Sequence, residues 1–303
     1  MLRTVKTSDL SIGYFVDGPA NGHPVVLLHG WPDDALTWNR VVADLHTAGY
    51  RTYAPYLRGF GPTRIEEAST QRSGQLSALG ADVIAFSDAL ALDRFALVGH
   101  DWGARAAYIA AALWPERVTD VVALSVGWGT NDPDQSISLK QARNYWYHWY
   151  MALPRGKDLV EKQRREFTRY IWDIWCPHWK VSDEEFEATA ASFDNPDWAE
   201  VVIHSYRHRW GFAPGDSRFD ALERRLSPPP SISAPTLLLH GAADPCNSPA
   251  TSENKERFFS GRYERKLLAQ VGHFPQREVP EQVASEIIAW LQRPFVQFNL
   301  ERR

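Results

Sequence analysis

The chain has 303 residues, a formal net charge of −4, 44% hydrophobic residues and 23% charged residues. This composition is typical of a globular protein with enough apolar residues for a large core. Nucleic acids and anionic membranes attract basic proteins, so the negative charge disfavours both as partners. The two cysteines, Cys176 and Cys246, are too few for a disulfide framework. There is no signal-peptide pattern and no apolar run near the roughly 18 residues of a membrane span. We therefore expect a soluble, cytoplasmic protein.

Short apolar runs bounded by turn residues alternate with longer stretches of helical periodicity. This pattern predicts strands over residues 24–28, 51–55, 95–99, 118–126, 235–240 and 264–271. It predicts helices over residues 35–48, 76–90, 103–114 and 280–291. The alternation implies a mostly parallel sheet covered by helices on both faces, with the functional loops at the carboxyl ends of the strands.

Residues 131–228 have a different pattern. Aromatic and charged residues alternate there at helical spacing, as in EKQRREFTRYIWDIW, between the breaker-rich segments NDPD and SPPPSISAP. We predict a helical cap domain over 131–228, inserted into a core domain formed by 1–130 and 229–303. Seven of the thirteen tryptophans lie in this cap. They could form plain core or line a pocket for an apolar ligand.

The strand predicted over 95–99 leads into the motif Gly99-His100-Asp101-Trp102-Gly103 and then into a helical run. The spacing Gly-x-nucleophile-x-Gly is typical of a sharp turn that exposes the central side chain above the sheet. The helix N-terminus would keep Asp101 ionised. A carboxylate can displace a leaving group at a saturated carbon, and the resulting ester must then be hydrolysed by water. Taken alone, Asp101 could be only a helix N-cap.

Two further polar residues follow predicted strands. Asp244 lies in GAADP after 235–240, and His273 lies in VGHFP at the end of 264–271. The order nucleophile, acid, histidine agrees with a catalytic triad in which Asp244 orients His273 and His273 activates the water. The plainer alternatives are a turn residue and a structural histidine.

The motif His29-Gly30-Trp31-Pro32 follows the first predicted strand. Its proline indicates a rigid turn that could contain a cis peptide bond. We expect the backbone N–H groups of Trp31 and Trp102 to form an oxyanion hole for ester hydrolysis. A simple loop is the alternative.

Together, HGWP, GHDWG, GAADP and VGHFP resemble the epoxide hydrolase and haloalkane dehalogenase family of the α/β-hydrolase superfamily, and the likeness covers nearly the whole chain. The resemblance implies an α/β-hydrolase fold with a cap, and an enzyme that converts a small apolar epoxide to a vicinal diol as a monomer or homodimer. It also implies that two cap tyrosines polarise the epoxide oxygen and donate a proton to it. Tyr147 and Tyr206 match these positions. Tyr145 and Tyr150 are alternatives for the first, and plain cap packing is the alternative for both.

His148 stands where this family often has glutamine, so it could contact substrate or tune Tyr147. We expect Trp31, Trp102, His148 and Trp149 to contact the substrate. The sequence shows no metal-ligand spacing, phosphate-binding loop or dinucleotide motif, and we expect neither a metal nor a cofactor.

Two other functions remain open. A haloalkane or haloacid dehalogenase would use the same Asp101, and the pair His148-Trp149 with Arg105 resembles the fluoroacetate dehalogenases. Those enzymes carry an arginine directly after the nucleophile, where this chain has Trp102, so we expect a carboxylate to bind poorly. A non-catalytic small-molecule receptor on the same scaffold is the third possibility, and a serine-type esterase is disfavoured by Asp101.

Overall fold

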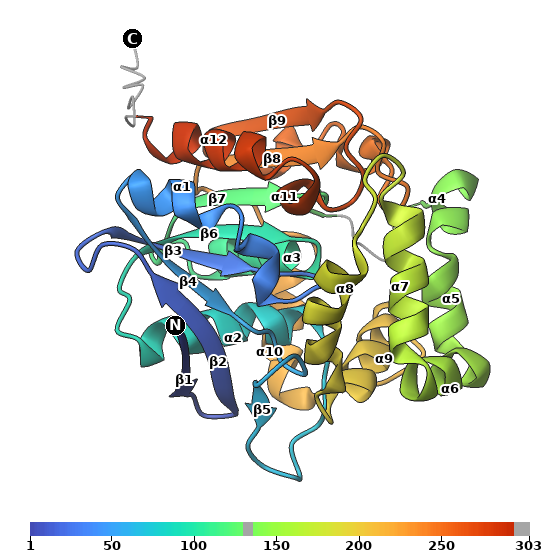
Figure 1. Cartoon of the computed structure of the whole chain (residues 1–303). Helices are drawn as coiled ribbons and strands as arrows, with labels where there is room; N and C mark the ends of the chain where they lie inside the picture. Colours follow the sequence, from blue (N-terminus) through green and yellow to red (C-terminus); the bar gives the residue numbers. More distant parts are fainter. Residues whose placement is uncertain (130–135, 294–303) are drawn as a thin grey trace.

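A computed structural model describes residues 1–129 and 136–293 of the chain. In this part of the chain the strands form one sheet in the order β1-β2-β4-β3-β6-β7-β8-β9, with β5 paired to β2 (Figure 1). Pairing is antiparallel among β1, β2, β4 and β5 and parallel from β4 to β9. The strands are β1 (Leu2–Lys6), β2 (Leu10–Asp17), β3 (His23–Leu28), β4 (Tyr50–Pro55), β5 (Arg64–Ile65), β6 (Phe95–His100), β7 (Val118–Leu124), β8 (Thr236–Gly241) and β9 (Tyr263–Leu268).

Helices cover both faces of the sheet. On one face α2 (Leu76–Ala89) packs against α3 (Trp102–Leu113), and on the other α1 (Val42–Thr47) packs against α12 (Pro280–Leu291) (Figure 1). Every residue of β6 and β8 is buried, as expected for strands with helices on both sides. The short helix α11 (Pro275–Glu278) precedes α12. The predicted parallel sheet with flanking helices is confirmed.

The structure corrects the sequence prediction in two places. The helix predicted over 35–48 is two short pieces, a 3-10 turn at Ala35–Trp38 and α1 at Val42–Thr47. The side chain of Asp34 caps the 3-10 turn, because its Oδ1 accepts a hydrogen bond from the Leu36 N–H at 3.0 Å. Strands β1 and β2 were not predicted. β1 is largely exposed and owes its conformation to pairing with β2.

Helices α4 to α10 follow one another between β7 and β8, and no described residue from 136 to 228 lies in a strand. Most of them stand to one side of the sheet (Figure 1). They are α4 (Leu139–Asn144), α5 (Trp146–Ala152), α6 (Pro154–Lys162), α7 (Arg164–Trp175), α8 (Asp183–Ala190), α9 (Trp198–Arg209) and α10 (Asp220–Leu226). Shorter 3-10 turns lie at Ala191–Asp194, Ser217–Phe219, Pro249–Ser252 and Glu256–Phe258. The predicted domain boundary at 130/131 falls outside the described residues, so the division into core and cap stays a prediction.

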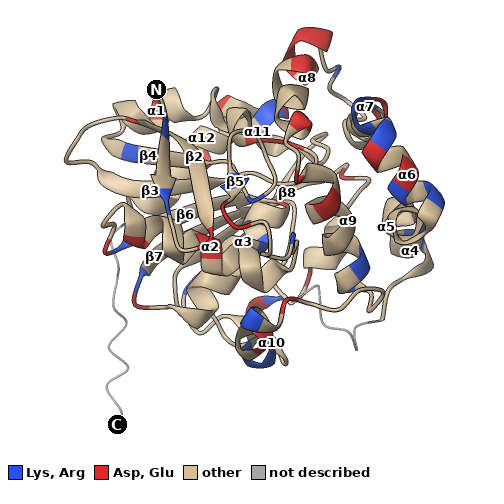
Figure 2. Cartoon of the chain, turned by 90° about the horizontal axis from the view of Figure 1, so that it is seen from below, with Lys and Arg blue, Asp and Glu red and all other residues tan. Residues whose placement is uncertain are grey.

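Charged residues of both signs are spread over the surface. Acidic residues gather on α8, and acidic and basic residues alternate along α6 and α7 (Figure 2). Among the helices that the structure describes, none combines the length and apolar character needed to cross a membrane.

Candidate active site

Asp101 stands at the sharp turn between β6 and α3. Its backbone has φ +49° and ψ −111°, a conformation that residues with a side chain rarely adopt. The turn brings the backbones of Gly99 and Gly103 so close that a Cβ on Gly99 would collide with the Gly103 carbonyl group. Small residues at both positions are therefore required. Asp101 is 6% exposed at the carboxyl edge of the parallel sheet.

Trp31 contacts Asp101 from the loop after β3. Its backbone N–H donates a hydrogen bond to Asp101 Oδ1 at 3.1 Å. The Trp31–Pro32 peptide bond is cis. Trp102 is the first residue of α3, so its backbone N–H has no acceptor within the helix. This arrangement offers two backbone donors near the Asp101 carboxyl group.

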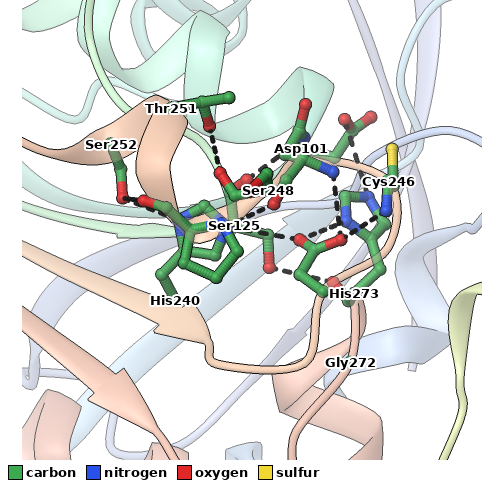
Figure 3. Close-up of polar contacts among 12 residues, drawn as sticks. Asp101, Ser125, His240, Cys246, Ser248, Thr251, Ser252, Gly272 and His273 are labelled. Carbon is green, nitrogen blue, oxygen red and sulfur yellow. Dashed lines mark hydrogen bonds and ion pairs between the residues drawn. The ribbon is translucent and has the colours of Figure 1, made fainter. Parts of the chain in front are cut away.

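His273 lies between the two carboxylates, in the loop after β9 (Figure 3). Its Nδ1 is 2.9 Å from Asp244 Oδ2, and its Nε2 is 3.8 Å from Asp101 Oδ2. Asp244 Oδ1 accepts hydrogen bonds from the backbone N–H groups of Cys246 and Asn247 at 2.8 and 3.0 Å. The structure thus brings the three predicted triad residues together.

Electrostatic interactions among these buried side chains shift the pKa values of Asp244 and His273. Burial alone would raise the pKa of Asp244, but the neighbouring His273 and His240 together outweigh it and hold the pKa well below its usual range. Burial alone would lower the pKa of His273, but Asp244 and, more weakly, Asp101 hold it above its usual value. The Asp101 contribution depends on its negative charge, which an ester would not carry.

The backbone of His273 is held on both sides. Its carbonyl oxygen accepts hydrogen bonds from His100 Nε2 at 2.7 Å and from Ser125 Oγ at 2.9 Å. The Glu278 carboxylate accepts the two backbone N–H groups that flank His273, at 2.8 and 3.0 Å. Burial lowers the pKa of His100 to about 4, so this residue is a neutral donor. These bonds fix the position of the His273 ring.

Tyr147 of α5 and Tyr206 of α9 meet above Trp31. The Tyr147 ring stacks on the Trp31 indole at 5.4 Å, and the Tyr206 ring meets the same indole edge-on at 5.3 Å. The two tyrosine rings are 5.4 Å apart. Burial raises both pKa values well above the usual range. Both hydroxyl groups are therefore protonated at neutral pH. Both rings pack on Trp31, the residue whose backbone N–H contacts Asp101.

Tyr145 and Tyr150, the alternatives to Tyr147, have different surroundings. The Tyr145 hydroxyl donates a hydrogen bond to Asn247 Oδ1 at 2.9 Å, so its proton is already engaged. Tyr150 packs against Trp146 at 6.2 Å and is partly exposed. The Tyr147 hydroxyl lies 3.4 Å from the sulfur of Cys246. The sequence did not indicate this contact, because Cys246 belongs to the loop after β8.

His148 is buried among the tyrosines. Its ring stacks on Tyr145 at 4.3 Å and lies 4.5 Å from the Tyr206 ring. Its Nδ1 accepts a hydrogen bond from the Trp210 indole N–H at 3.1 Å, and burial lowers its pKa well below the usual value. His148 is therefore neutral and carries its proton on Nε2, which has no hydrogen-bond partner among the described residues.

Trp149 lies farther out than the other predicted contact residues. Its indole N–H donates to the Ala142 carbonyl oxygen at 3.0 Å, and its ring packs on Trp210 at 4.6 Å. Its hydrogen-bonding capacity is therefore used within the protein. Trp210, which the sequence did not single out, takes the place beside His148.

One cluster of potential metal ligands coincides with the triad. Ligand atoms of Asp244, Cys246 and His273 all lie within 4.8 Å of one another. Two of these residues are already bonded to each other, and burial raises the pKa of the Cys246 thiol well above its usual value. A neutral thiol is a poor metal ligand. The arrangement fits the triad better than a metal centre.

The mostly parallel sheet and the sharp turn at Asp101 are those of a hydrolase of the α/β type, and the comparisons with known proteins agree. The family described as alpha/beta hydrolase fold matches residues 23–278, and the chain belongs to this family. Epoxide hydrolase A of Mycobacterium tuberculosis is 27% identical over 95% of this chain and 96% of its own length. An epoxide hydrolase of Caballeronia sordidicola is 28% identical over 95% of this chain and 94% of its own length.

A solved structure supports the same assignment. A Klebsiella pneumoniae protein, provisionally named an epoxide hydrolase, is 37% identical with a TM-score of 0.89. The alignment covers 95% of this chain and 96% of that protein. The predicted resemblance and fold class are confirmed, and the roles of individual site residues stay predictions.

Proposed function

We propose that the protein is an epoxide hydrolase that converts a small epoxide to a vicinal diol through an ester of Asp101. One observation carries the proposal. Two buried, protonated tyrosines, Tyr147 and Tyr206, meet over Trp31, whose backbone N–H contacts the Asp101 carboxylate. Ring opening requires a nucleophile and an acid. The carboxylate is suited to the first role and the tyrosines to the second. The aromatic surroundings favour an apolar substrate.

In the first step an oxygen of Asp101 attacks a ring carbon, and the bond from this carbon to the epoxide oxygen breaks. The two tyrosine hydroxyl groups hold the epoxide oxygen, and one of them gives it a proton. Without that proton the epoxide oxygen would leave as a strongly basic alkoxide, which has a high energetic cost. The products are a hydroxyalkyl ester of Asp101 and a tyrosinate.

In the second step His273 takes a proton from water, and the hydroxide attacks the ester carbonyl carbon. The N–H groups of Trp31 and Trp102 stabilise the tetrahedral oxyanion. The bond from this carbon to the alkyl oxygen breaks, and His273 returns its proton to the departing alcohol. The remaining water proton leaves the Asp101 carboxyl group and restores the tyrosine. Once Asp101 is an ester its charge no longer raises the pKa of His273, so a larger fraction of His273 is neutral and able to accept the water proton in this step.

A dehalogenase is the second candidate. The indole N–H groups of Trp31 and Trp102 are buried without a hydrogen-bond partner in the described part of the chain, and such donors suit a leaving halide. The Trp149 N–H is engaged by Ala142, which weighs against the halide pair His148-Trp149. The receptor alternative gives no reason for a hydrogen-bonded Asp244–His273 pair beside Asp101.

We also propose that residues 131–228 act as a cap that supplies the tyrosines.

Parallel product assays test the function. The purified protein is given an aryl epoxide and, separately, a terminal bromoalkane, and diol and bromide are measured. We expect diol formation that Asp101→Asn abolishes and that Tyr147→Phe lowers. Faster bromide release, unaffected by Tyr147→Phe, would favour the dehalogenase instead.

A further inference from the structure

A pocket lies where α2 and α3 meet α9 and α10. Its volume is about 260 Å³, and its walls include the apolar side chains of Ile109, Trp128 and Leu226. Its polar lining includes Arg105 of α3 and Arg209 at the end of α9. The pocket therefore combines an apolar body with two cations.

Arg209 lacks a charged partner. Its Nε and Nη2 atoms are buried and have no hydrogen-bond partner among the described residues. Its guanidinium lies 5.1 Å from the centre of the Tyr206 ring. A buried charge without hydrogen bonds has a high energetic cost. An anionic ligand that bonds to this guanidinium would therefore be bound favourably.

The surrounding charges do not neutralise Arg209. Burial and then the nearby Arg105 lower the pKa of Arg209 below its usual value. The acid in the pocket lining is Glu223, whose Oε1 already accepts hydrogen bonds from the Ser77 hydroxyl and from Gln75 Nε2. Glu223 does not bond to the Nε and Nη2 atoms of Arg209, which have no hydrogen-bond partner among the described residues. Among the described residues, Arg209 thus brings a positive charge to this pocket without a hydrogen-bonded anion.

We propose that this pocket binds the carboxylate of an amphipathic organic acid. The Arg209 guanidinium would hold the carboxylate by a charge-assisted hydrogen bond, and the apolar part of the acid would lie along Ile109, Trp128 and Leu226. The sequence led us to expect poor carboxylate binding, because Trp102 follows the nucleophile. Arg209 supplies a cation from a different helix, beside the Tyr206 ring.

Calorimetry with hexanoate and its neutral analogue hexanamide tests the site. We expect wild-type protein to bind hexanoate roughly tenfold or more tightly than hexanamide, since charge-assisted hydrogen bonds to a buried guanidinium would be lost with the amide. Arg209→Gln should remove this preference. Arg207→Gln is the matched control, because Arg207 lies on the same helix but donates to the Phe212 carbonyl oxygen.

Two results would overturn the proposal. One is equal affinity of the wild-type protein for acid and amide, which needs no variant to fold. The other is unchanged hexanoate binding by Arg209→Gln. Because hexanoate is not turned over, this measurement is independent of the proposed epoxide chemistry.

Kinetics then identify the source of the carboxylate, and this step rests on the proposed function. If the carboxylate is part of the substrate, Arg209→Gln should lower kcat/KM for a terminal epoxy acid about tenfold but not for its primary amide. If it belongs to a separate ligand, hexanoate should alter wild-type turnover of the neutral epoxide but not turnover by Arg209→Gln. Either outcome supports the site.

Discussion

The indole N–H of Trp210 donates to Nδ1 of His148 at 3.1 Å, and this bond fixes the tautomer of a buried histidine. His148 Nε2–H is thereby left as a neutral donor, in a ring that lies 4.3 Å from the Tyr147 ring and 4.5 Å from the Tyr206 ring. We infer that it helps to hold the epoxide oxygen or to orient Tyr147.

Trp210→Phe should slow ester formation about three- to tenfold, because a lost hydrogen bond of about 0.5–1.5 kcal/mol leaves the tautomer unfixed. Single-turnover kinetics measure this step. Trp149→Phe is the matched control, since Trp149 contacts Trp210 but donates only to the Ala142 carbonyl oxygen. Equal losses in the two variants would mean that Trp210 acts through packing alone.

The double variant Tyr147→Phe with Tyr206→Phe should slow ester formation by at least about a hundredfold, the usual contribution of a positioned general acid. Ester hydrolysis should change far less, because it depends on His273. Rapid quenching separates the two rates. Tyr145→Phe serves as the control, as its hydroxyl is bonded to Asn247. Equal slowing of both steps would rule out the tyrosines as ring-opening acids.

Asp244→Asn should slow ester hydrolysis by about 10²–10⁴-fold, because the amide no longer favours the required tautomer of His273. The pH dependence should also move. Asp244 raises the pKa of His273, and His273 acts as a base only when neutral, so wild-type hydrolysis is lost as pH falls through this raised value. In the variant the acidic limb should shift to lower pH. An unmoved limb in the pH profile of pre-formed ester would contradict this assignment.

Much of the site follows from the sequence because each part lies directly after a strand. Asp101, Asp244 and His273 follow β6, β8 and β9, and parallel strands bring their carboxyl ends to one edge. Neighbouring strands thus assemble the triad without any information about the cap.

The contacts that depend on packing between distant segments could not be predicted. Trp210 reaches His148 from the end of α9, and Cys246 reaches Tyr147 from the loop after β8. Arg209 is an ordinary charged residue in the sequence, and only the packing of α9 and α10 against the core buries its guanidinium. The apolar spacing in 35–48 likewise fits one helix or two short turns, and the Asp34 cap decides between them.

Asp34 also yields a prediction for stability. Burial and the adjacent Asp33 raise the pKa of Asp34 well above its usual value, whereas Arg277 pairs with Asp33 at 2.6 Å. In the unfolded chain Asp34 ionises near its ordinary pKa of about 3.9. Its contribution to stability is therefore lost progressively as pH rises from that value to the higher folded-state pKa.

Asp34→Asn should accordingly raise Tm at pH 7 by roughly 2–4 °C, the shift expected from about 1 kcal/mol in a protein of this size. The amide can still accept the Leu36 N–H. Near pH 4 the gain should disappear. Asp33→Asn should instead lower Tm strongly, because it removes the buried carboxylate that accepts two hydrogen bonds from Arg277. A lower Tm of Asp34→Asn at both pH values would contradict the protonated state of Asp34.

The central claim is a covalent ester at Asp101, and the intact mass of His273→Ala after brief incubation with an aryl epoxide tests it most directly. Without the base the ester should accumulate. We expect a mass gain equal to the whole epoxide, and no gain when Asp101→Asn is added. A gain equal to an alkyl group alone, seen only with a bromoalkane, would identify a dehalogenase. No adduct with either reagent would contradict the proposed chemistry.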